Sequence, residues 1–339
     1  MNTNTSFAPK SRNSILPNRS GKAAGAVIAV VAIIAIAALV WFFVFRSGGG
    51  ASGGMVSKYI PKDVTAYGGV DMAGLMSSDV YKAFKPQVDA ALSAGPMKEA
   101  TEKTGVTPEK ISALAFAMGA TPADMLVTVK GDLDAEKINA AMKEQMKEGF
   151  AEIDLEGSKF VNLGMGGYSF GDDGVMIGGT QNMVASALKV SKGGESVEKS
   201  ADLPALAKNV DTGATFWAVG AVPKDAIENA KSIPMVGNLV GSVTHTALSV
   251  DVGSGLNIQL AVKMGSDDAA TQAKTAIDGF VAMGKTEAEK VPDIGADLKK
   301  VIDGLKVEVS GSILKFSVEI DSATTNKFIE MAKKQGGLG

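Results

Sequence analysis

Two stretches, ISALAFAMG at residues 111–119 and HTALSVDVG at residues 245–253, align without a gap and indicate how this chain is built. Their identical positions are Ala113 with Ala247, Leu114 with Leu248, and Gly119 with Gly253. After a short turn, each is followed by a second matching stretch, MLVTVKG at 125–131 and IQLAVKMG at 258–265, and these two share a Val–Lys pair. Each half of the chain is therefore predicted to contain the same two-stranded hairpin.

The elements around the two hairpins match in the same order. Each hairpin is preceded by a strand-like stretch and followed by a helix, a strand–turn–strand unit and a closing helix. In the first half these are VTAYGGV (64–70), DLDAEKINAAMKEQM (132–146), KFVNLGMGGYSFGDDGVMIGG (159–179) and residues 181–190. In the second half they are GATFWAV (213–219), DDAATQAKTAIDGFV (267–281), LKVEVSGSILKFSVEI (305–320) and residues 322–334. So many matches in one order indicate an internal duplication.

Alternation of apolar and polar residues within the strands predicts the fold class. Val307 and Val309, and then Phe316, Val318 and Ile320, occupy every second position, as in a half-buried strand. Polar residues on the other face are typical of an antiparallel sheet with one solvated or lightly covered side. We therefore expect an α+β fold of two similar lobes, each of antiparallel strands with helices on one face, whose sheets are joined or packed side by side.

The composition limits the chemistry that the chain can perform. Its 339 residues are 45% apolar and 21% charged, a balance typical of globular proteins. Cysteine is absent, which excludes disulfides, cysteine zinc sites, thiol nucleophiles and the lipid-bearing cysteine of a bacterial lipoprotein. The single histidine, His245, excludes metal sites that need a histidine pair. The 16 methionines favour an adaptable core over a methionine-lined ligand groove.

Residues 23–45 (AAGAVIAVVAIIAIAALVWFFVF) form an uncharged apolar run. It is long enough to cross a bilayer at about 20 residues per span, whereas a cleaved signal peptide has an apolar core of about 7–15 residues. We therefore predict a single-pass transmembrane signal anchor. Lys10, Arg12, Arg19 and Lys22 precede it without any acidic residue, so the N-terminus is expected to stay in the cytoplasm. This predicts a bacterial inner (cytoplasmic) membrane protein whose C-terminal ectodomain lies in the periplasm or outside the cell.

Charge and composition divide the chain into segments. All 37 acidic residues lie beyond the predicted span, where they outnumber the basic residues. This acidic ectodomain argues against nucleic-acid binding and against adhesion to anionic lipid headgroups. The predicted segments are a disordered cytoplasmic tail (1–22), the transmembrane anchor (23–45), a Gly/Ser-rich tether (46–57), ectodomain repeat 1 (58–192), a connector (193–204), ectodomain repeat 2 (205–334) and a flexible tail (335–339).

The stretch GFVAMGKT at 279–286 matches the nucleotide-binding pattern G-x-x-x-x-G-K-S/T. A working P-loop follows a buried strand, but the residues around Gly279 have helical periodicity. The apolar stripe consists of Ala273, Ala276, Ile277, Phe280, Val281 and Gly284. At the matching place the first half has Phe150 instead of Lys285, and the predicted location is poor in nucleotides. We interpret the match as a false positive within a helix and expect no nucleotide.

Other candidate sites have simpler structural interpretations. His245 is expected on the less buried face of a strand, together with Val243 and Ala247. Residues 171–174 (Gly-Asp-Asp-Gly) resemble a cation site but are flanked by strands, which predicts a hairpin turn. Four aspartates at predicted helix starts are interpreted as caps, namely Asp132, Asp134, Asp267 and Asp268. Tyr67 and Trp217 are interpreted as core or interface anchors, with a ligand groove as the alternative.

The opening of the predicted ectodomain, Tyr59 to Asp71 (YIPKDVTAYGGVD), resembles that of a loose group of bacterial envelope proteins of unknown function. In that group a signal anchor or signal peptide precedes a P-x-D-x-x-x-Y/F-x-x-V-D opening. The phrases DGVMIGG at 173–179 and GGES at 193–196 are also similar to it. The resemblance covers most of the ectodomain and implies a membrane-anchored envelope protein with a duplicated α+β ectodomain. It transfers no catalytic residue.

These observations predict a function without enzymatic chemistry. The sequence offers no catalytic, cofactor-binding or metal-binding residue, and we expect no cofactor. The leading hypothesis is a membrane-tethered envelope module that binds a protein partner or organises the cell surface. The alternative is a carrier or sensor for an apolar ligand such as a lipid, held between the lobes. A hydrolase with an unrecognised site is a third hypothesis, and no motif favours it.

Overall fold

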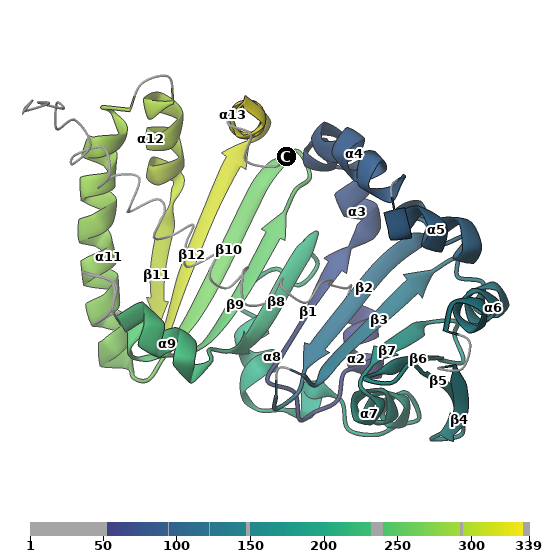
Figure 1. Cartoon of the computed structure of the whole chain (residues 1–339). Helices are drawn as coiled ribbons and strands as arrows, with labels where there is room; N and C mark the ends of the chain where they lie inside the picture. The colour runs from purple at the N-terminus through teal and green to yellow at the C-terminus, as the bar shows by residue number, and fades with distance from the viewer. Residues whose placement is uncertain are drawn as a thin grey trace, which may run out of the picture.

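The computed structural model describes most of the chain beyond residue 52. The described ranges are 53–93, 95–121, 123–146, 150–231, 240–291 and 294–334. Within them the strands form one twelve-stranded sheet in the order β11-β12-β10-β9-β8-β1-β2-β3-β7-β6-β5-β4 (Figure 1). All neighbouring pairs are antiparallel. The expected mixed α+β class with an antiparallel sheet is confirmed.

The strands are β1 (Ala66–Asp71), β2 (Ile111–Met118), β3 (Met125–Gly131), β4 (Ala151–Leu155), β5 (Ser158–Asn162), β6 (Gly167–Phe170), β7 (Met176–Gly179), β8 (Phe216–Ala221), β9 (Val243–Asp251), β10 (Gly255–Met264), β11 (Lys306–Ser310) and β12 (Ile313–Asp321). The α-helices are α2 (Gly53–Tyr59), α3 (Met72–Ser77), α4 (Asp79–Leu92), α5 (Gly95–Thr104), α6 (Ala135–Met146), α7 (Gln181–Ser191), α8 (Asp202–Ala207), α9 (Lys224–Lys231), α11 (Asp267–Ala288), α12 (Gly295–Gly304) and α13 (Ser322–Lys334). Two short 3₁₀ turns are η1 (Pro108–Lys110) and η3 (Val197–Lys199).

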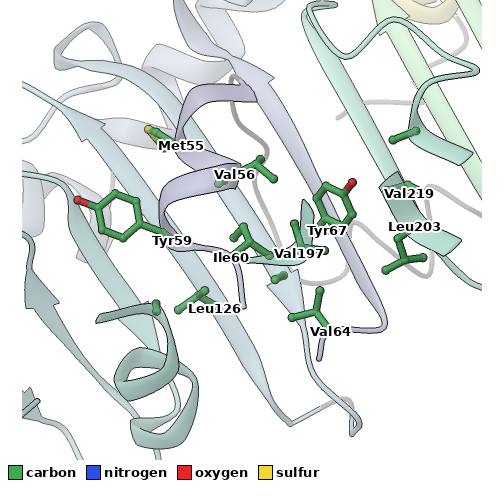
Figure 2. Packing of buried hydrophobic residues seen from close by; sticks show 14 of the residues in the cluster. Met55, Val56, Tyr59, Ile60, Val64, Tyr67, Leu126, Val197, Leu203 and Val219 are labelled. Atoms are coloured by element: carbon green, nitrogen blue, oxygen red, sulfur yellow. The ribbon is translucent and has the colours of Figure 1, made fainter. Parts of the chain in front are cut away.

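The two faces of the sheet pack against different helices. On one, which we call the α7 face, buried side chains of α2, α7 and α8 meet the strands. Figure 2 shows those of α2 together with Leu203 of α8. On the other, the α11 face, α3 and α11 cover the middle and second half of the sheet, and α6 covers β5 and β6. Because successive strand residues point to opposite faces, the alternation read from the sequence sorts the side chains between these two cores.

The strand order of the first half repeats in the second. Outward from the centre it is β1-β2-β3-β7-β6 on one side and β8-β9-β10-β12-β11 on the other. When the shared Val–Lys pairs are aligned, Thr128 matches Ala261. The cross-strand neighbour of Thr128 is Ala115, and that of Ala261 is Ala247. Ala247 therefore corresponds to Ala115 and not to Ala113, so the ungapped alignment of these strands is two residues out. A shift of two keeps each side chain on its own face, so the apolar pattern alone does not detect it.

The halves meet where β1 pairs with β8, with Gly68 opposite Ala218, so their strands form one joined sheet. Tyr67 and Trp217 occupy matching positions of the two halves on the α7 face. Their rings meet edge to face, with centroids 5.4 Å apart and an interplanar angle of 89°. Both side chains are buried, so they anchor the core at the joint.

Helix α2 docks onto the sheet at the turn between β6 and β7. Lys58 pairs with Asp173 (2.7 Å), and the Tyr59 hydroxyl donates a hydrogen bond to the same carboxylate. Burial, together with this hydrogen bond and the charges of Asp173 and Asp172, raises the pKa of Tyr59. Burial also opposes ionisation of Asp173, but the hydrogen bonds from Lys58 and Tyr59 outweigh it and hold the pKa of that carboxyl below its usual value.

Two predicted linking segments contain packed structure. The tether predicted at 46–57 overlaps α2, which begins at Gly53 and buries Met55 and Val56. The connector predicted at 193–204 contains η3 and the start of α8, with Val197 and Leu203 in the core of the α7 face. In both segments a few apolar residues among glycines and polar residues contact the sheet, and these contacts outweigh the local composition.

The predicted transmembrane anchor at 23–45 lies outside the described residues, as do the tails predicted at 1–22 and 335–339. None of the described helices combines the length and the apolar character that a bilayer-spanning segment needs.

Candidate functional site: an uncovered polar face of the sheet

The α7 face is covered differently in its two halves. In the first half, α7 packs over β3, β6 and β7. In the second half, α8 packs over β8 and β9. The helix that follows the last strand there, α13, does not occupy the place of α7. It lies at the ends of the strands, near α12 and α4 (Figure 1). Within the described residues, no helix therefore takes the place of α7 over β10, β11 and β12, although Ala261 of β10 is still buried in the core of this face.

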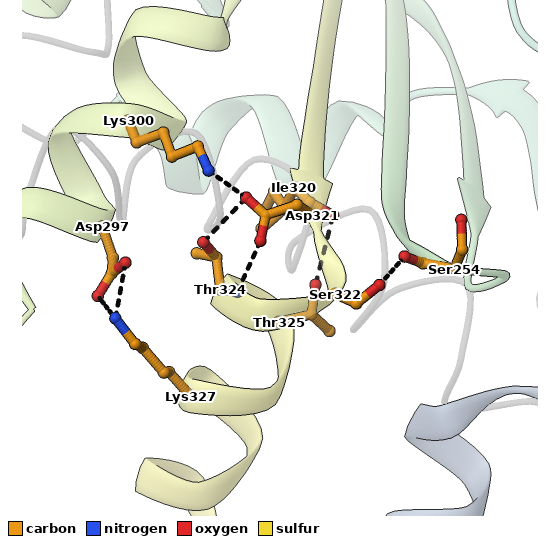
Figure 3. A network of polar contacts seen from close by, with 9 residues as sticks. All are labelled: Ser254, Asp297, Lys300, Ile320, Asp321, Ser322, Thr324, Thr325 and Lys327. Carbon is orange, nitrogen blue, oxygen red and sulfur yellow. Dashed lines mark hydrogen bonds and ion pairs between the residues drawn. The ribbon is translucent and has the colours of Figure 1, made fainter.

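Polar contacts hold α13 at the end of the sheet (Figure 3). Asp321, at the end of β12, accepts a hydrogen bond from the backbone N–H of Thr324 (2.9 Å) and another from the ammonium group of Lys300 on α12. Lys327 of α13 pairs with Asp297 of α12 (2.9 Å). These bonds cap the first turn of α13 and tie it to α12.

The contribution of the Asp321 cap to folding stability is expected to depend on pH. The Lys300 hydrogen bond, followed by that from the Thr324 N–H, holds the pKa of Asp321 below its ordinary value of 3.8. A carboxyl with a lowered folded-state pKa stabilises the fold above its unfolded pKa, and this contribution is lost as the pH falls through the folded pKa. Asp321→Asn should therefore lower the urea midpoint of the purified chain at pH 7, and the difference from wild type should shrink below pH 3.8. Equal midpoints at pH 7 would contradict it.

We call the uncovered polar side chains the open face. They are Gln259, Lys306, Glu308, Lys315 and Ser317. The register of the strands identifies the matching residues of the first half: Leu126 for Gln259, Ile177 for Lys315, Ser169 for Glu308, Gly179 for Ser317, and Gly167 for Lys306. Leu126 and Ile177 are each 0% exposed beneath helices. The same lattice of positions is thus apolar or small where a helix covers it and polar where none does.

The open face surrounds a shallow cavity of about 190 Å³, whose lining also includes Asn209. The carboxamide oxygen of Gln259 accepts a hydrogen bond from the backbone N–H of Asp211 (3.0 Å), which leaves its NH₂ group as a donor. Asn209 donates its NH₂ group to the carbonyls of Ala205 (3.0 Å) and Leu206 (3.2 Å), which leaves its carbonyl oxygen as an acceptor. Both amides are thus oriented by the segment that ends α8.

Charges of both signs stand beside these amides. Glu308 lies directly opposite Lys315 across the strand pair, and Lys306 lies opposite Ser317. None of these three charged groups forms an ion pair with another described residue, although many surface lysines of the described chain do. The open face therefore presents ammonium, carboxylate, amide and hydroxyl groups that can bind a polar partner.

His245 lies at one border of this surface. It pairs across the strands with Lys263, which itself pairs with Asp202 of α8 (2.6 Å). Burial lowers the pKa of His245. The nearby charge of Asp202 opposes this shift and that of Lys263 adds to it, so the imidazole is neutral at pH 7. His245 shares the α7 face with Ala247 as expected. Val243 packs in the core of the α11 face instead, because the register shifts at this end of β10.

The P-loop-like stretch at 279–286 lies wholly inside α11. Its backbone N–H groups are engaged in the helix and do not form a phosphate-binding loop. Gly284 is buried, and Lys285 pairs with Asp303 of α12 (2.9 Å). Phe280 is only half-buried, because the face of α11 that meets the core runs through Ala270, Ala273 and Gly284. Phe280 is therefore a weaker core residue than the apolar stripe predicts.

The predicted acidic sites have structural partners. Residues 171–174 form the turn between β6 and β7, where Asp173 binds Lys58 and Tyr59 of α2. Asp134 caps α6 by accepting from the backbone N–H of Lys137 (3.0 Å). At α11 the cap is Ser266, whose hydroxyl accepts from the N–H of Ala269 (3.1 Å), while Asp267 and Asp268 lie in the first turn.

Sequence reasoning did not single out any residue of the open face. The relevant signal was present: polar residues at alternate positions of 305–320 predicted a solvated side of the sheet. Recognising the site, however, required the pairing register, because only the register shows that Lys315 stands where Ile177 does in the other half.

Comparisons with known proteins give a distant structural similarity. No protein-family model matches the sequence, and no curated protein matches it. Among solved structures, crystal form I of TP0453 is similar at a TM-score of 0.44 and 12% identity, covering 81% of this chain and 95% of that one. Crystal form III is similar at a TM-score of 0.43 and 12% identity, with 81% and 96% covered. These values assign no activity, ligand or partner to this chain.

Proposed function

We propose that this protein is a single-pass bacterial envelope module that binds a protein partner through the open face and has no catalytic role. In this proposal residues 23–45 anchor the chain in the inner membrane with the N-terminus in the cytoplasm. The two similar lobes then arise by internal duplication and lie outside the cytoplasm. The apolar run, the basic residues before it and the repeated strand order support this arrangement.

The observation that carries the proposal is the contrast between matching positions of the two halves. A sheet face that is exposed but has no binding role needs only polar side chains that keep the protein soluble. The open face additionally has amides oriented by hydrogen bonds to backbone groups of residues 205–211, and charges without an intramolecular ion pair among the described residues. A polar surface with fixed donors and acceptors suits recognition of a protein surface of complementary charge, because charged side chains set partner specificity and association rate.

Site-specific photo-crosslinking in intact cells tests the proposal. A photoreactive residue in place of Ser317 should form one discrete adduct, whereas the same residue at Thr275 on the exposed side of α11 should not. Lys315→Glu should reduce the Ser317 adduct about tenfold, because it reverses a charge at the contact. Lys224→Glu, an exposed lysine of α9, is the matched control and should leave the adduct unchanged.

Two outcomes would overturn the proposal. One is the absence of any Ser317 adduct above the Thr275 background. The other is an adduct whose yield is unaffected both by Lys315→Glu and by Glu308→Lys, since the charges of the open face would then play no part in binding.

The alternative proposal is a carrier of an apolar ligand. Half-buried apolar side chains on the α11 face, including Val250, Ile258 and Phe316, favour it. Against it, the cavities at the open face and beside α6 are open to solvent, and charged side chains line both. Mass spectrometry of lipid extracts from the natively purified chain distinguishes the two proposals, because a carrier should retain a stoichiometric lipid.

A further inference from the structure

Strand β4 is the edge strand at the end of the sheet away from β11. Among the described residues it pairs with β5 alone, from Ala151 opposite Asn162 to Leu155 opposite Ser158, so its other edge has no partner there. The connecting residues Glu156 and Gly157 have φ of 53° and 70°, as in a type I′ hairpin. In such a two-residue hairpin the closing pair is hydrogen-bonded and the pairs alternate from there. The backbone N–H and C=O groups of Glu152 and Asp154 therefore point away from the sheet.

The side chains of β4 have opposite character on its two faces. Ile153 and Leu155 are half-buried against the core of the α7 face. Glu152 lies on the α11 face, directly opposite Val161. Its carboxylate is 3.8 Å from the ammonium group of Lys159, an exposed pair of little energetic value. The edge thus offers an apolar strip on one side and an accessible carboxylate on the other.

A cavity of about 320 Å³ adjoins the carboxylate side of this edge. It is lined by Asn139, Ala140, Lys143, Phe150 and Glu152. The hydroxyl of Tyr168 donates a hydrogen bond to the carboxamide oxygen of Asn139 (2.8 Å), which leaves the NH₂ group of Asn139 as a donor. An open strand edge beside a side-chain pocket is the arrangement by which sheets bind extended peptides.

The charge of β4 disfavours a second copy of the same strand as the occupant. An antiparallel pair centred on Ile153 would place Glu152 of one copy opposite Asp154 of the other. A pair centred on Glu152 would place the two Glu152 side chains together. Like charges directly opposite each other destabilise a strand pair, and acidic residues at a sheet edge are a common protection against self-association.

We propose that the β4 edge binds an extended peptide segment of a partner protein in which basic residues alternate with apolar ones. The peptide pairs with the outward backbone groups of Glu152 and Asp154. A lysine or arginine opposite Glu152 then lies at the cavity beside α6, and the peptide's apolar residues at the alternate positions lie opposite Ile153 and Leu155. This site is separate from the open face and does not depend on it.

The test uses the purified full chain and a fluorescent seven-residue peptide of alternating valine and lysine. Anisotropy titration should show saturable binding. Glu152→Lys should weaken it about tenfold, because it turns a favourable cross-strand charge pair into a repulsive one. The same variant should gain binding to a valine–glutamate peptide, which excludes misfolding as the cause of the loss. Asp225→Lys, at an exposed position of α9, is the matched control and should leave the affinity unchanged.

A backbone-methylated version of the peptide separates strand addition from simple charge attraction. Methyl groups on alternate peptide nitrogens remove the donors that pair with β4 but keep every side chain, so binding should fall at least about tenfold. Equal affinity for the methylated peptide would overturn the proposal. An affinity that Glu152→Lys leaves unchanged would also overturn it, as would an affinity that Asp225→Lys abolishes. A dimer of the chain that Glu152→Lys disrupts would assign the edge to a second copy instead.

Discussion

Replacing Trp217 with alanine is expected to lower the free energy of unfolding by about 3–5 kcal/mol, the range measured for large aromatic residues truncated in protein cores. Trp217 is 3% exposed and packs edge to face against Tyr67 at the joint between the two halves. Its removal leaves a cavity in the centre of the sheet and takes away an aromatic contact. Urea denaturation of the purified chain, followed by circular dichroism at a helical wavelength, measures the loss.

Met283→Ala is the matched control for this truncation. Met283 lies on α11 and is 59% exposed, so its replacement should change the free energy of unfolding by no more than about 0.5 kcal/mol. A loss below about 1 kcal/mol for Trp217→Ala would mean that Trp217 does not anchor the joint. The ligand-groove interpretation of this aromatic pair would then gain weight, since surface aromatics in grooves contribute little to stability.

Gly68→Ala is expected to destabilise the fold by about 3 kcal/mol, at the upper end of the usual cost of overpacking. A Cβ atom at Gly68 would overlap the carbonyl oxygen of Trp217 on the neighbouring strand. It would also lie 2.8 Å from the Cα of Ala218 and 2.8 Å from the ring of Phe116. Two of these three atoms belong to the backbone of β8, so relief requires the central strand pair to move apart.

Gly279→Ala provides the comparison, with the opposite sign expected. Gly279 lies inside α11 and a Cβ atom there would meet nothing within 4 Å. Alanine is favoured over glycine in a helix by about 1 kcal/mol, so this variant should be more stable than wild type. Because Gly279 is the first glycine of the P-loop-like stretch, the same variant tests that interpretation. A loss of stability would contradict the helical account.

Much of the fold could be predicted from local patterns. The helix read from the apolar stripe at 267–281 is the start of α11, which continues to Ala288. The paired strands of both hairpins are present as β2–β3 and β9–β10. These elements were accessible because alternation of period two and stripes of period 3.6 are properties of a single stretch of sequence.

The elements that were missed depend on partners distant in sequence. Strand β4 (AEIDL) carries two acidic residues, and its strand conformation follows from pairing with β5 across a tight turn. The alignment error of two residues between β2 and β9 has the same origin, since only the cross-strand neighbours decide the register. Phe280 was overestimated as a core residue because a helical stripe gives the direction of a side chain and not the depth of burial.

Predicting the candidate site required both local sequence patterns and the pairing of strands that are distant in sequence. The polar identities of Gln259, Glu308 and Lys315 are visible in the sequence, and they predict a solvated side of the sheet. That they form one surface around a cavity follows from the pairing of three strands. Their lack of cover follows from the placement of α13, which is held by the contacts of Asp321 and Lys327.

The pairing of β1 with β8 also determines when the centre of the sheet can close during synthesis of the chain. Gly68 and Ala218 are opposite each other, so about 150 residues are synthesised between them, and at about 5–20 residues per second β1 waits roughly 8–30 s for its second neighbour. During that interval the first half has an open apolar edge in what becomes the middle of the sheet. Closure of so long a loop is slow compared with hairpin formation. The growing chain therefore passes through a stage in which its centre, and not its periphery, is the surface most exposed to misassembly.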